Sequence, residues 1–380
     1  MLDIIDDTKG LYRNIQIAKE RLKKTTDPDE KMCLRVYIDT IYSAIQNVQE
    51  RDLCKSNRDI FGSYKNFKKI IYKQNQYESE MIDNYIDNKE FISDYMGKIA
   101  RGVDKLKPND SENYTSYELL SIDDFWDIFY QFMKSIYLDE FFDEYINNSH
   151  IYNCCSDDNV PGWMMVDPIN NNYDIFLGFL IPNIYSLLVL AHEFGHVYDF
   201  NEHKVDAKTF NKSMLQSFNG EVFSCLFERL FLDFLNNNNI LEDDFERIKI
   251  NTMKVNYNYL VSSYILSLLK DSYLENLDFT YMSNEEIYYI VKNKLKIDFD
   301  SIIEYMLPFD LAENNAYAFG DVFSMFLFDR IKKEGFNNEL VSKFINERYR
   351  MFNKDFIIDN GLSSDNYLEL YKKELKLIKK

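Results

Sequence analysis

The sequence has few cysteines, and they form no recognisable framework. The 380 residues include five, Cys33, Cys54, Cys154, Cys155 and Cys225. Their odd number and scattered positions argue against a disulfide scaffold, and none has the spacing of a zinc knuckle. Cys154 and Cys155 are adjacent and cannot form an ordinary unstrained bridge. We therefore expect free thiols in a reducing compartment, and a cytoplasmic protein.

The sequence also lacks an apolar run that could span a membrane. Its longest apolar stretch, residues 175–191, is interrupted by Gly178, Pro182, Asn183 and Ser186. The first residues, MLDIIDD, do not show the basic segment and apolar segment of a secretory leader. We expect neither a signal peptide nor a membrane partner.

Basic residues are fewer than acidic residues. Lysine and arginine number 44 against 63 aspartates and glutamates, which gives a formal net charge of −19. Nucleic-acid binding needs clustered Lys and Arg to neutralise phosphates, so we expect no nucleic-acid partner. With 46% hydrophobic and 28% charged residues, the composition is typical of a globular protein that has ample core.

Most of the chain shows the apolar periodicity of helices. Hydrophobic residues recur at helical spacing over residues 2–22 and 32–48, and Ser121 begins a capping box before another helical stretch. We expect a mainly α protein. Its predicted organisation is a helical N-terminal lobe over residues 1–150 and a second lobe, which would contain the functional site, over residues 151–380, or one continuous unit in their place.

One region departs from this helical pattern. Trp163–Val166 and Tyr173–Leu180 are apolar and aromatic, and the residues between them are polar or turn-forming. This pattern predicts a β-hairpin with a longer turn. A helix should begin just after it, with Asn183 as its N-cap. Residues 184–191 are apolar nearly all round, which indicates a buried helix.

That predicted helix contains a metal motif, His192-Glu193-Phe194-Gly195-His196. Histidines at positions i and i+4 lie on one helix face, so both imidazoles can reach one ion. Glu193 is turned away from that face and can act as a general base beside a zinc ion. Two histidines and a glutamate on so apolar a helix would be costly without a metal. The motif therefore predicts a zinc site.

Glu221 is the favoured third ligand, 29 positions after His192. It begins a segment of helical spacing in which Glu228 follows two turns later on the same face. Two carboxylates on an apolar helix need partners. A metal for Glu221 and the second ring nitrogen of a ligand histidine for Glu228 would satisfy both. Glu202 and Asp206 remain competing third ligands, in a polar segment.

These motifs resemble those of the thimet oligopeptidase and oligoendopeptidase F family of zinc peptidases. The family's H-E-F/L-G-H matches residues 192–196. Its E-x-x-S-x-x-x-E helix matches Glu221, Ser224 and Glu228. The resemblance covers residues 160–330. It implies two helical lobes around a substrate channel, with a small hairpin or sheet beside the zinc-binding helix.

The resemblance also implies roles for residues outside the two motifs. Residues 316–325 are similar to the family's tyrosine-bearing helix, and Tyr317 falls where a tyrosine hydrogen-bonds the tetrahedral intermediate. The family uses a strand before the motif to hold the substrate backbone. The segment Tyr173–Leu180 would do so here, with Phe176 and Gly178 as substrate-binding residues. Gly178 could let a peptide backbone come close.

The sequence departs from the family upstream of Tyr317. The family usually has a histidine and further tyrosines there, where this chain has Tyr305 and Asn314. Tyr305 is therefore a second catalytic candidate. Asp321 and Ser324 fall one and two turns after Tyr317, on the face expected to look at the zinc.

Two functions remain open at this point. The first is a zinc-dependent endopeptidase that hydrolyses oligopeptides with Glu193 as general base. The second is a peptide- or protein-binding relative whose zinc site is weakly active or structural. The absence of any histidine after His203 supports the second, and the presence of Glu193 supports the first.

Overall fold

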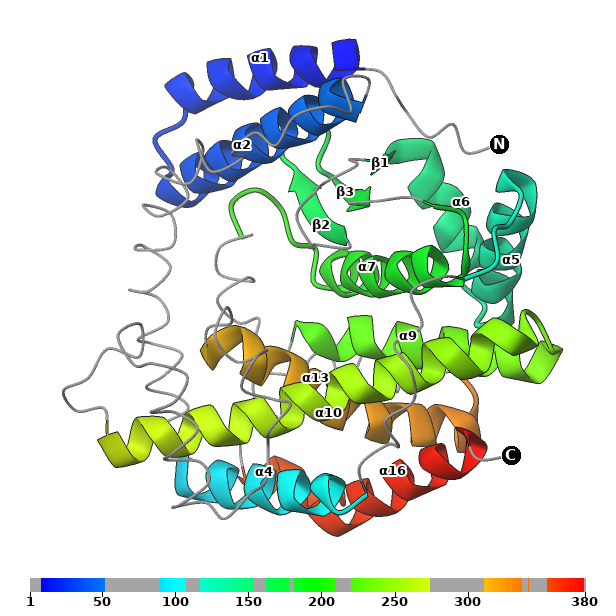
Figure 1. The fold of residues 1–380 in the computed structure, drawn as a ribbon. Helices are drawn as coiled ribbons and strands as arrows, with labels where there is room; N and C mark the ends of the chain where they lie inside the picture. The colour runs from blue at the N-terminus through cyan, green and yellow to red at the C-terminus, as the bar shows by residue number, and fades with distance from the viewer. Residues whose placement is uncertain are drawn as a thin grey trace.

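The structure is a computed structural model (Figure 1) that describes residues 8–51, 89–106, 117–153, 162–177, 181–209, 220–273, 311–336, 341 and 354–378. Its helices are α1 (Thr8–Lys24), α2 (Pro28–Arg51), α4 (Lys89–Asp104), α5 (Ile122–Ser135), α6 (Asp139–Asn148), α7 (Ile184–Glu202), α9 (Glu221–Asn238), α10 (Glu242–Tyr273), α13 (Leu311–Glu334), α15 (Lys354–Asp359) and α16 (Ser364–Ile378). Its strands are β1 (Ile151–Asn153), β2 (Gly162–Asp167) and β3 (Asn172–Leu177). The predicted fold class, mainly α with a small sheet, is confirmed.

The sheet contains the predicted hairpin and one further strand. Strands β2 and β3 pair in antiparallel fashion, with Trp163 opposite Phe176. Strand β1 pairs with β3 in parallel, with Ile151 opposite Ile175. The sequence pattern did not indicate β1, because three residues are too few to show an alternation. The resulting order, β1-β3-β2, places β3 at the centre of the sheet.

The central position of β3 corrects an expectation about substrate binding. No peptide can add beside residues 175–177, because both of their edges are already paired. The Phe176 side chain is 0% exposed, and its ring stacks on Tyr152 and Trp163 at centroid distances of 5.0 and 5.3 Å. Phe176 is therefore a core residue that cannot contact a substrate. Gly178 lies outside the described residues.

The elements stack in layers across the molecule (Figure 1). Helices α1 and α2 lie over one face of the sheet, and α7 lies against its other side. Helix α9 packs on α7 and in turn contacts α13, which packs on α10. Helices α4 and α16 form the far layer, next to α10. This order puts α7 in the interior, which explains why its apolar residues surround the whole helix.

Aromatic packing joins segments from before and after residue 150. Phe129 of α5 meets Phe194 of α7 at a ring-centroid distance of 6.0 Å. Phe132 of α5 meets Phe231 of α9 at 5.2 Å. Both contacts belong to one large core cluster. The division of the chain into two lobes at this point stays a prediction.

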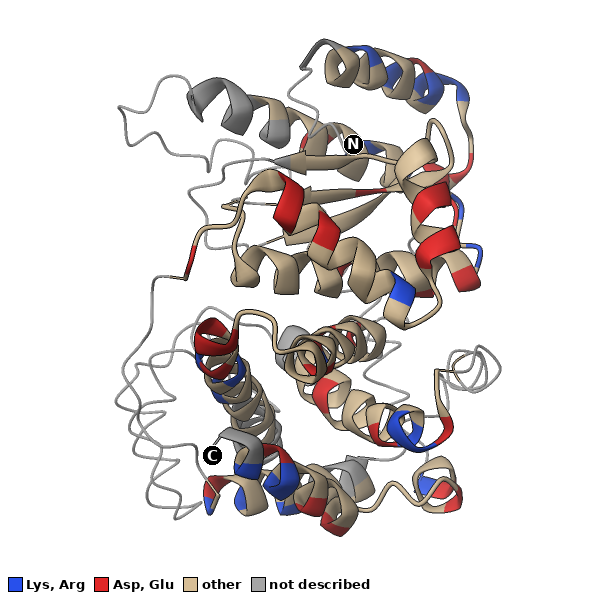
Figure 2. Cartoon of the chain, turned by 90° about the vertical axis from the view of Figure 1, so that its right-hand side faces the viewer, with Lys and Arg blue, Asp and Glu red and all other residues tan. Residues whose placement is uncertain are grey.

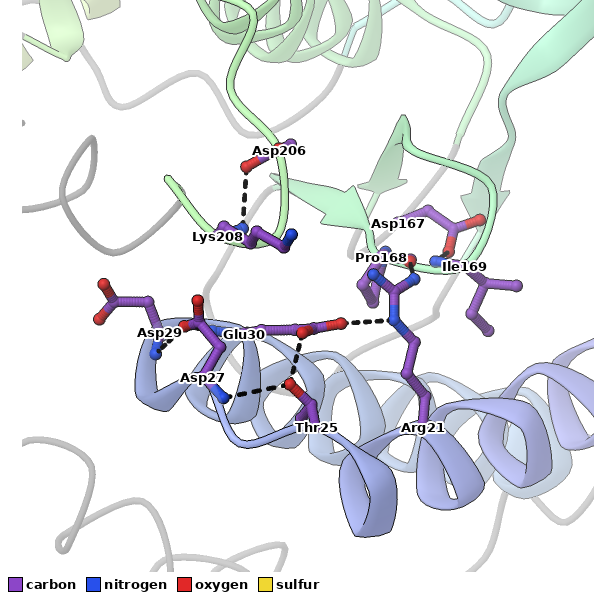
Figure 3. A network of polar contacts seen from close by, with 10 residues as sticks. All are labelled: Arg21, Thr25, Asp27, Asp29, Glu30, Asp167, Pro168, Ile169, Asp206 and Lys208. Atoms are coloured by element: carbon purple, nitrogen blue, oxygen red, sulfur yellow. Dashed lines mark hydrogen bonds and ion pairs between the residues drawn. The ribbon is translucent and has the colours of Figure 1, made fainter.

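Polar contacts hold the α1–α2 pair to the sheet (Figure 3). The Nε of Arg21 lies 2.6 Å from Glu30 Oε1, and its guanidinium also donates to the carbonyl of Pro168, in the turn between β2 and β3. Thr25 donates to the same Glu30 carboxylate. Asp27 caps the start of α2 by accepting from the Glu30 amide at 3.1 Å. These contacts hold the α1–α2 pair against the turn between β2 and β3.

Charged residues of both signs share the outer helices. Figure 2 shows Lys and Arg on helices at the top and at the bottom of the molecule, interspersed with Asp and Glu. Within the described ranges, no helix combines the length and the apolar character that crossing a membrane requires.

A buried ionic network connects helices α9, α10, α13 and α16. Arg229 of α9 donates to Asp321 of α13 and, at 2.7 Å, to Glu374 of α16. Asp321 also accepts from Asn256 of α10 at 2.6 Å and from the Tyr367 hydroxyl of α16. Arg229 is 9% exposed and Asp321 is 1% exposed, so each of these charges depends on its partners.

We expect Arg229→Ala to lower the free energy of unfolding by about 3–5 kcal/mol, because it leaves the Asp321 carboxylate buried without its main partner. Lys332→Ala is the matched control, since the ion pair between Lys332 and Asp233 is largely exposed and should contribute at most about 1 kcal/mol. Urea unfolding of the two variants measures the difference. Equal losses would show that the network does not stabilise this part of the fold.

Candidate metal centre

Helix α7 presents both histidines of the motif on one side. Its N-cap is Asn183, as predicted, and the Asn183 side chain accepts from the Ser186 amide at 3.0 Å. One turn apart, the His192 and His196 rings have centroids separated by 5.0 Å. Their side chains are 13% and 16% exposed. Both imidazoles therefore point from a mostly buried helix toward α9.

Two glycines allow α9 to come close to its neighbours. A Cβ on Gly195 of α7 would lie 2.6 Å from the Cα of Ser224 and from the carbonyl oxygen of Phe223. A Cβ on Gly320 of α13 would lie 2.6 Å from the Cβ of Glu221. No other residue fits at these distances without moving a backbone. The first turn of α9 is thus held between α7 and α13, with Glu221 next to the histidines.

Glu221, His192 and His196 converge with the separations of metal ligands. The Oε2 of Glu221 lies 3.3 Å from His192 Nε2 and 3.5 Å from His196 Nε2. The three ligand atoms all lie within 4.8 Å of one another. Ligands held at about 2.0–2.2 Å from a tetrahedral zinc are about 3.3–3.6 Å apart. Among the described residues, this group is the one that could hold a metal ion.

The alternative third ligands do not reach this group. Glu202 is exposed at the end of α7. Asp206 accepts hydrogen bonds from the amides of Lys208 and Thr209, both at 2.9 Å, and so caps a local turn. The geometry therefore favours Glu221 over both.

Two further side chains orient the ligands. Glu228 lies two turns after Glu221 on α9, and its Oε1 is 2.6 Å from His192 Nδ1. A proton held on Nδ1 leaves the Nε2 lone pair directed at the metal position. The Ser224 hydroxyl donates to Glu221 Oε2 at 2.8 Å. The Glu228 contact leaves Nε2 of His192 available to a metal, and the Ser224 contact fixes the Glu221 carboxylate through the oxygen that faces the histidines.

The charges around the three candidate ligands favour a bound cation. Burial, together with the charges of Glu221 and Glu228 and against the opposing effect of His192, raises the pKa of Glu193 to about 8. Burial also raises the pKa of Glu221, but His196 and His192 outweigh it and lower that pKa to about 2. Three carboxylates beside two imidazoles need positive charge. A divalent cation would provide it and would favour the ionised form of Glu193.

Glu193 lies beside the ligand group but is not part of it. Its side chain is 4% exposed and points toward the start of β2, where a Cβ on Gly162 would lie 3.1 Å from its Oε1. The Met164 amide donates a hydrogen bond to this carboxylate. The location is the one expected of a general base, and the role itself stays a prediction.

Tyr317 is located next to the histidines. Its ring stacks on His192 at a centroid distance of 6.2 Å, and it also stacks on Tyr259 of α10 at 4.5 Å. Asp321 and Ser324 are turned elsewhere, because both contact the Arg229 side chain. The expectation that all three share the metal-facing side is therefore wrong for Asp321 and Ser324. The helical spacing within α13 could not predict that Asp321 forms an ion pair with Arg229 of α9.

Two other residues that the sequence singled out cannot be compared with this group. Tyr305 lies outside the described residues, as does the side chain of Asn314. Sequence reasoning missed Gly162, which makes room for the Glu193 carboxylate, and Tyr259, the stacking partner of Tyr317. A glycine directly before the predicted strand Trp163–Val166 was a weak signal for the first. Nothing in the sequence pointed to the second.

No family model and no curated protein matches this sequence. Its structure is similar to a crystal structure described as that of a "putative oligoendopeptidase F from Bacillus anthracis str. Ames", with a TM-score of 0.50 and 13% sequence identity. The similarity covers 90% of this chain and 64% of that one, so this chain spans less than two thirds of its length. At this identity the comparison shows a shared fold.

We expect Glu221→Ala to lower metal occupancy far more than Glu202→Ala or Asp206→Ala, because it removes one of three converging protein ligands. The measurement is metal content after dialysis against a weak chelator, with the two other variants as matched carboxylate controls. Stoichiometric metal in dialysed Glu221→Ala protein would place the third ligand elsewhere.

Proposed function

We propose that the protein is a zinc-dependent endopeptidase of short peptides, with zinc held by His192, His196 and Glu221. The main support is that three ligands from the described part of the chain converge beside a buried carboxylate, Glu193, that is not one of them. Structural zinc sites are closed by four protein ligands, whereas three leave a position for water or substrate. The fold shared with the structure described as an oligoendopeptidase supports the same class of enzyme.

Glu193 would act as the general base. His192, His196 and Glu221 would hold the zinc ion, which when bound would supply a water of lowered pKa and a Lewis acid for the scissile carbonyl. Glu193 takes a proton from the attacking water and later passes it to the leaving amine. The Met164 amide holds the Glu193 carboxylate in place for both transfers. Glu228 keeps the His192 ring oriented throughout, through its 2.6 Å contact with Nδ1.

Tyr317 would stabilise the oxyanion. Its ring is fixed between His192 and Tyr259 by stacking on both. A phenol held at this place can donate to the carbonyl oxygen as negative charge develops on it. Such a donor contributes most in the transition state, where the charge is largest. Tyr305 stays a candidate for a second donor.

The substrate would be an extended oligopeptide that pairs with β2. One edge of β2 pairs with β3, and no described strand pairs with its other edge. Gly162 at the start of β2 lies against Glu193, so a peptide added along this outer edge would run past the general base. Backbone pairing of this kind requires an extended chain. Compactly folded proteins would therefore be poor substrates.

A second function is a peptide- or protein-binding relative with a weakly active or structural zinc site. The absence of any histidine after His203 favours it, because the resemblance leads one to expect a histidine near the catalytic tyrosine. Zinc content measured together with turnover of a quenched peptide library separates the two functions. Stoichiometric zinc with no turnover would favour the binding protein.

We expect Glu193→Gln to retain zinc and to lose peptide turnover by at least about a hundredfold, the scale of general-base catalysis. Glu202→Gln, on the same helix but exposed, is the matched control and should keep both. The assays are zinc content and hydrolysis of quenched peptides. Turnover that is unaffected by Glu193→Gln would exclude this residue as the base.

We expect Tyr317→Phe to lower kcat by roughly ten- to a thousandfold, the range for one oxyanion donor, with a smaller change in KM. Only a hydroxyl is removed, so both stacking contacts, the zinc content and the melting temperature should hardly change. Steady-state kinetics and thermal unfolding test this together. A stability loss with unchanged kcat would identify Tyr317 as a packing residue.

A further inference from the structure

Tyr185 is an exposed aromatic residue on the metal-facing side of α7. It lies seven residues before His192, which is two helical turns, or about 10 Å along the axis. It remains 44% exposed between two buried neighbours. Burial raises the pKa of the Tyr185 phenol, as do Tyr117 and the charge of Glu228. Glu228 is the partner of His192, so the Tyr185 side chain lies within electrostatic reach of the metal centre.

The Tyr117 ring lies beside this ring in an offset stack. The Tyr117 and Tyr185 rings are nearly parallel, at an interplanar angle of 3° and a centroid distance of 6.3 Å. The Tyr117 hydroxyl accepts a hydrogen bond from Asn251 of α10 at 2.8 Å. The pair thus reaches from α7 to α10, across the space between these two helices.

The segment that carries Tyr117 is held at both ends. The Glu118 amide donates to Asp244, in the first turn of α10, at 2.7 Å. The Leu120 amide donates to the carbonyl of Pro182, in the loop before α7, also at 2.7 Å. Residues 117–120 therefore bridge α7 and α10, and the aromatic pair is preorganised.

One side of α10 leads from this pair to the metal centre. Val255 is four residues after Asn251 and four before Tyr259, so the three lie along one side of the helix. Val255 is 48% exposed, although it lies between Asn251, which contacts Tyr117, and Tyr259, which contacts Tyr317. Tyr259 stacks on Tyr317, which stacks on His192. Exposed apolar groups arranged in this way, next to a reactive centre, mark a binding surface.

We propose that Tyr117 and Tyr185 form a subsite for an aromatic or large apolar side chain of the peptide substrate, about three residues from the scissile bond. This inference rests on the proposed peptidase function. An extended peptide advances about 3.3 Å per residue, so three residues cover the distance from His192 to Tyr185. A third ring packed on the exposed part of Tyr185 would lose contact with water and gain an aromatic pair.

The test is a set of nonapeptides with Phe or Ala at each position up to four residues from the cleaved bond. The native protein should prefer Phe over Ala by about two- to tenfold in kcat/KM at the third position on one side, as expected for one aromatic contact. Tyr185→Ala should reduce this preference to less than about twofold, by lowering kcat/KM for the Phe peptide more than for the all-Ala peptide. Tyr185→Phe should retain the preference. Tyr12→Ala, on α1 and 41% exposed, is the matched control.

The proposal is overturned if Tyr185→Ala keeps the preference, or if it slows the Ala and Phe peptides equally. If the zinc-loaded protein cleaves no peptide at all, the proposed function fails. The subsite is then tested on its own by measuring how tightly the peptides bind. Fluorescence anisotropy with labelled Phe and Ala peptides gives the two dissociation constants. A Phe preference that is lost in Tyr185→Ala would support the subsite without turnover, and no Phe preference in the native protein would exclude it.

Discussion

The close contact between α7 and α9 at Gly195 is the constraint on which the site depends. Packed helices usually lie about 8–10 Å apart, and a glycine at the crossing lets two backbones approach more closely. At this separation, Glu221 and Glu228 both reach imidazole nitrogens of α7. A larger side chain at Gly195 would collide with the backbone of α9 and separate the ligands. Packing and metal chemistry therefore depend on the same contact.

The charges of α9 fix its rotation. Glu221 and Glu228 face α7, and Arg229 faces α13 and α16, so turning the helix would leave charges on both sides without partners. Removing one partner of a buried pair is costly, which makes this orientation specific. The contact between Arg229 and Glu374 also brings the C-terminal helix α16 into the layer behind the metal centre. A segment remote in sequence thus helps to hold the helix that supplies a ligand.

The local part of the site could be predicted from the sequence. The helical period alone places His192 and His196 on one face and Glu193 beside it, because backbone hydrogen bonding sets that period. The same argument places Glu221 and Glu228 on one stripe of the next helix. The two apolar and aromatic runs before the motif predict the hairpin of β2 and β3, and Asn183 marks the start of α7. Each of these features depends on residues that are near one another in the chain.

Pairing between distant segments was decided only by the tertiary structure. An apolar and aromatic run indicates that Phe176 belongs to a strand, but β1 places that strand in the centre of the sheet and α1 and α2 bury its side chain. Likewise, helical spacing groups Tyr317 with Asp321, whereas Arg229 takes the aspartate away from the metal side. The sequence by itself determined which residues could form a metal site, because backbone periodicity is local. The tertiary structure decided which faces meet, because that depends on how all the elements bury their apolar and charged surfaces together.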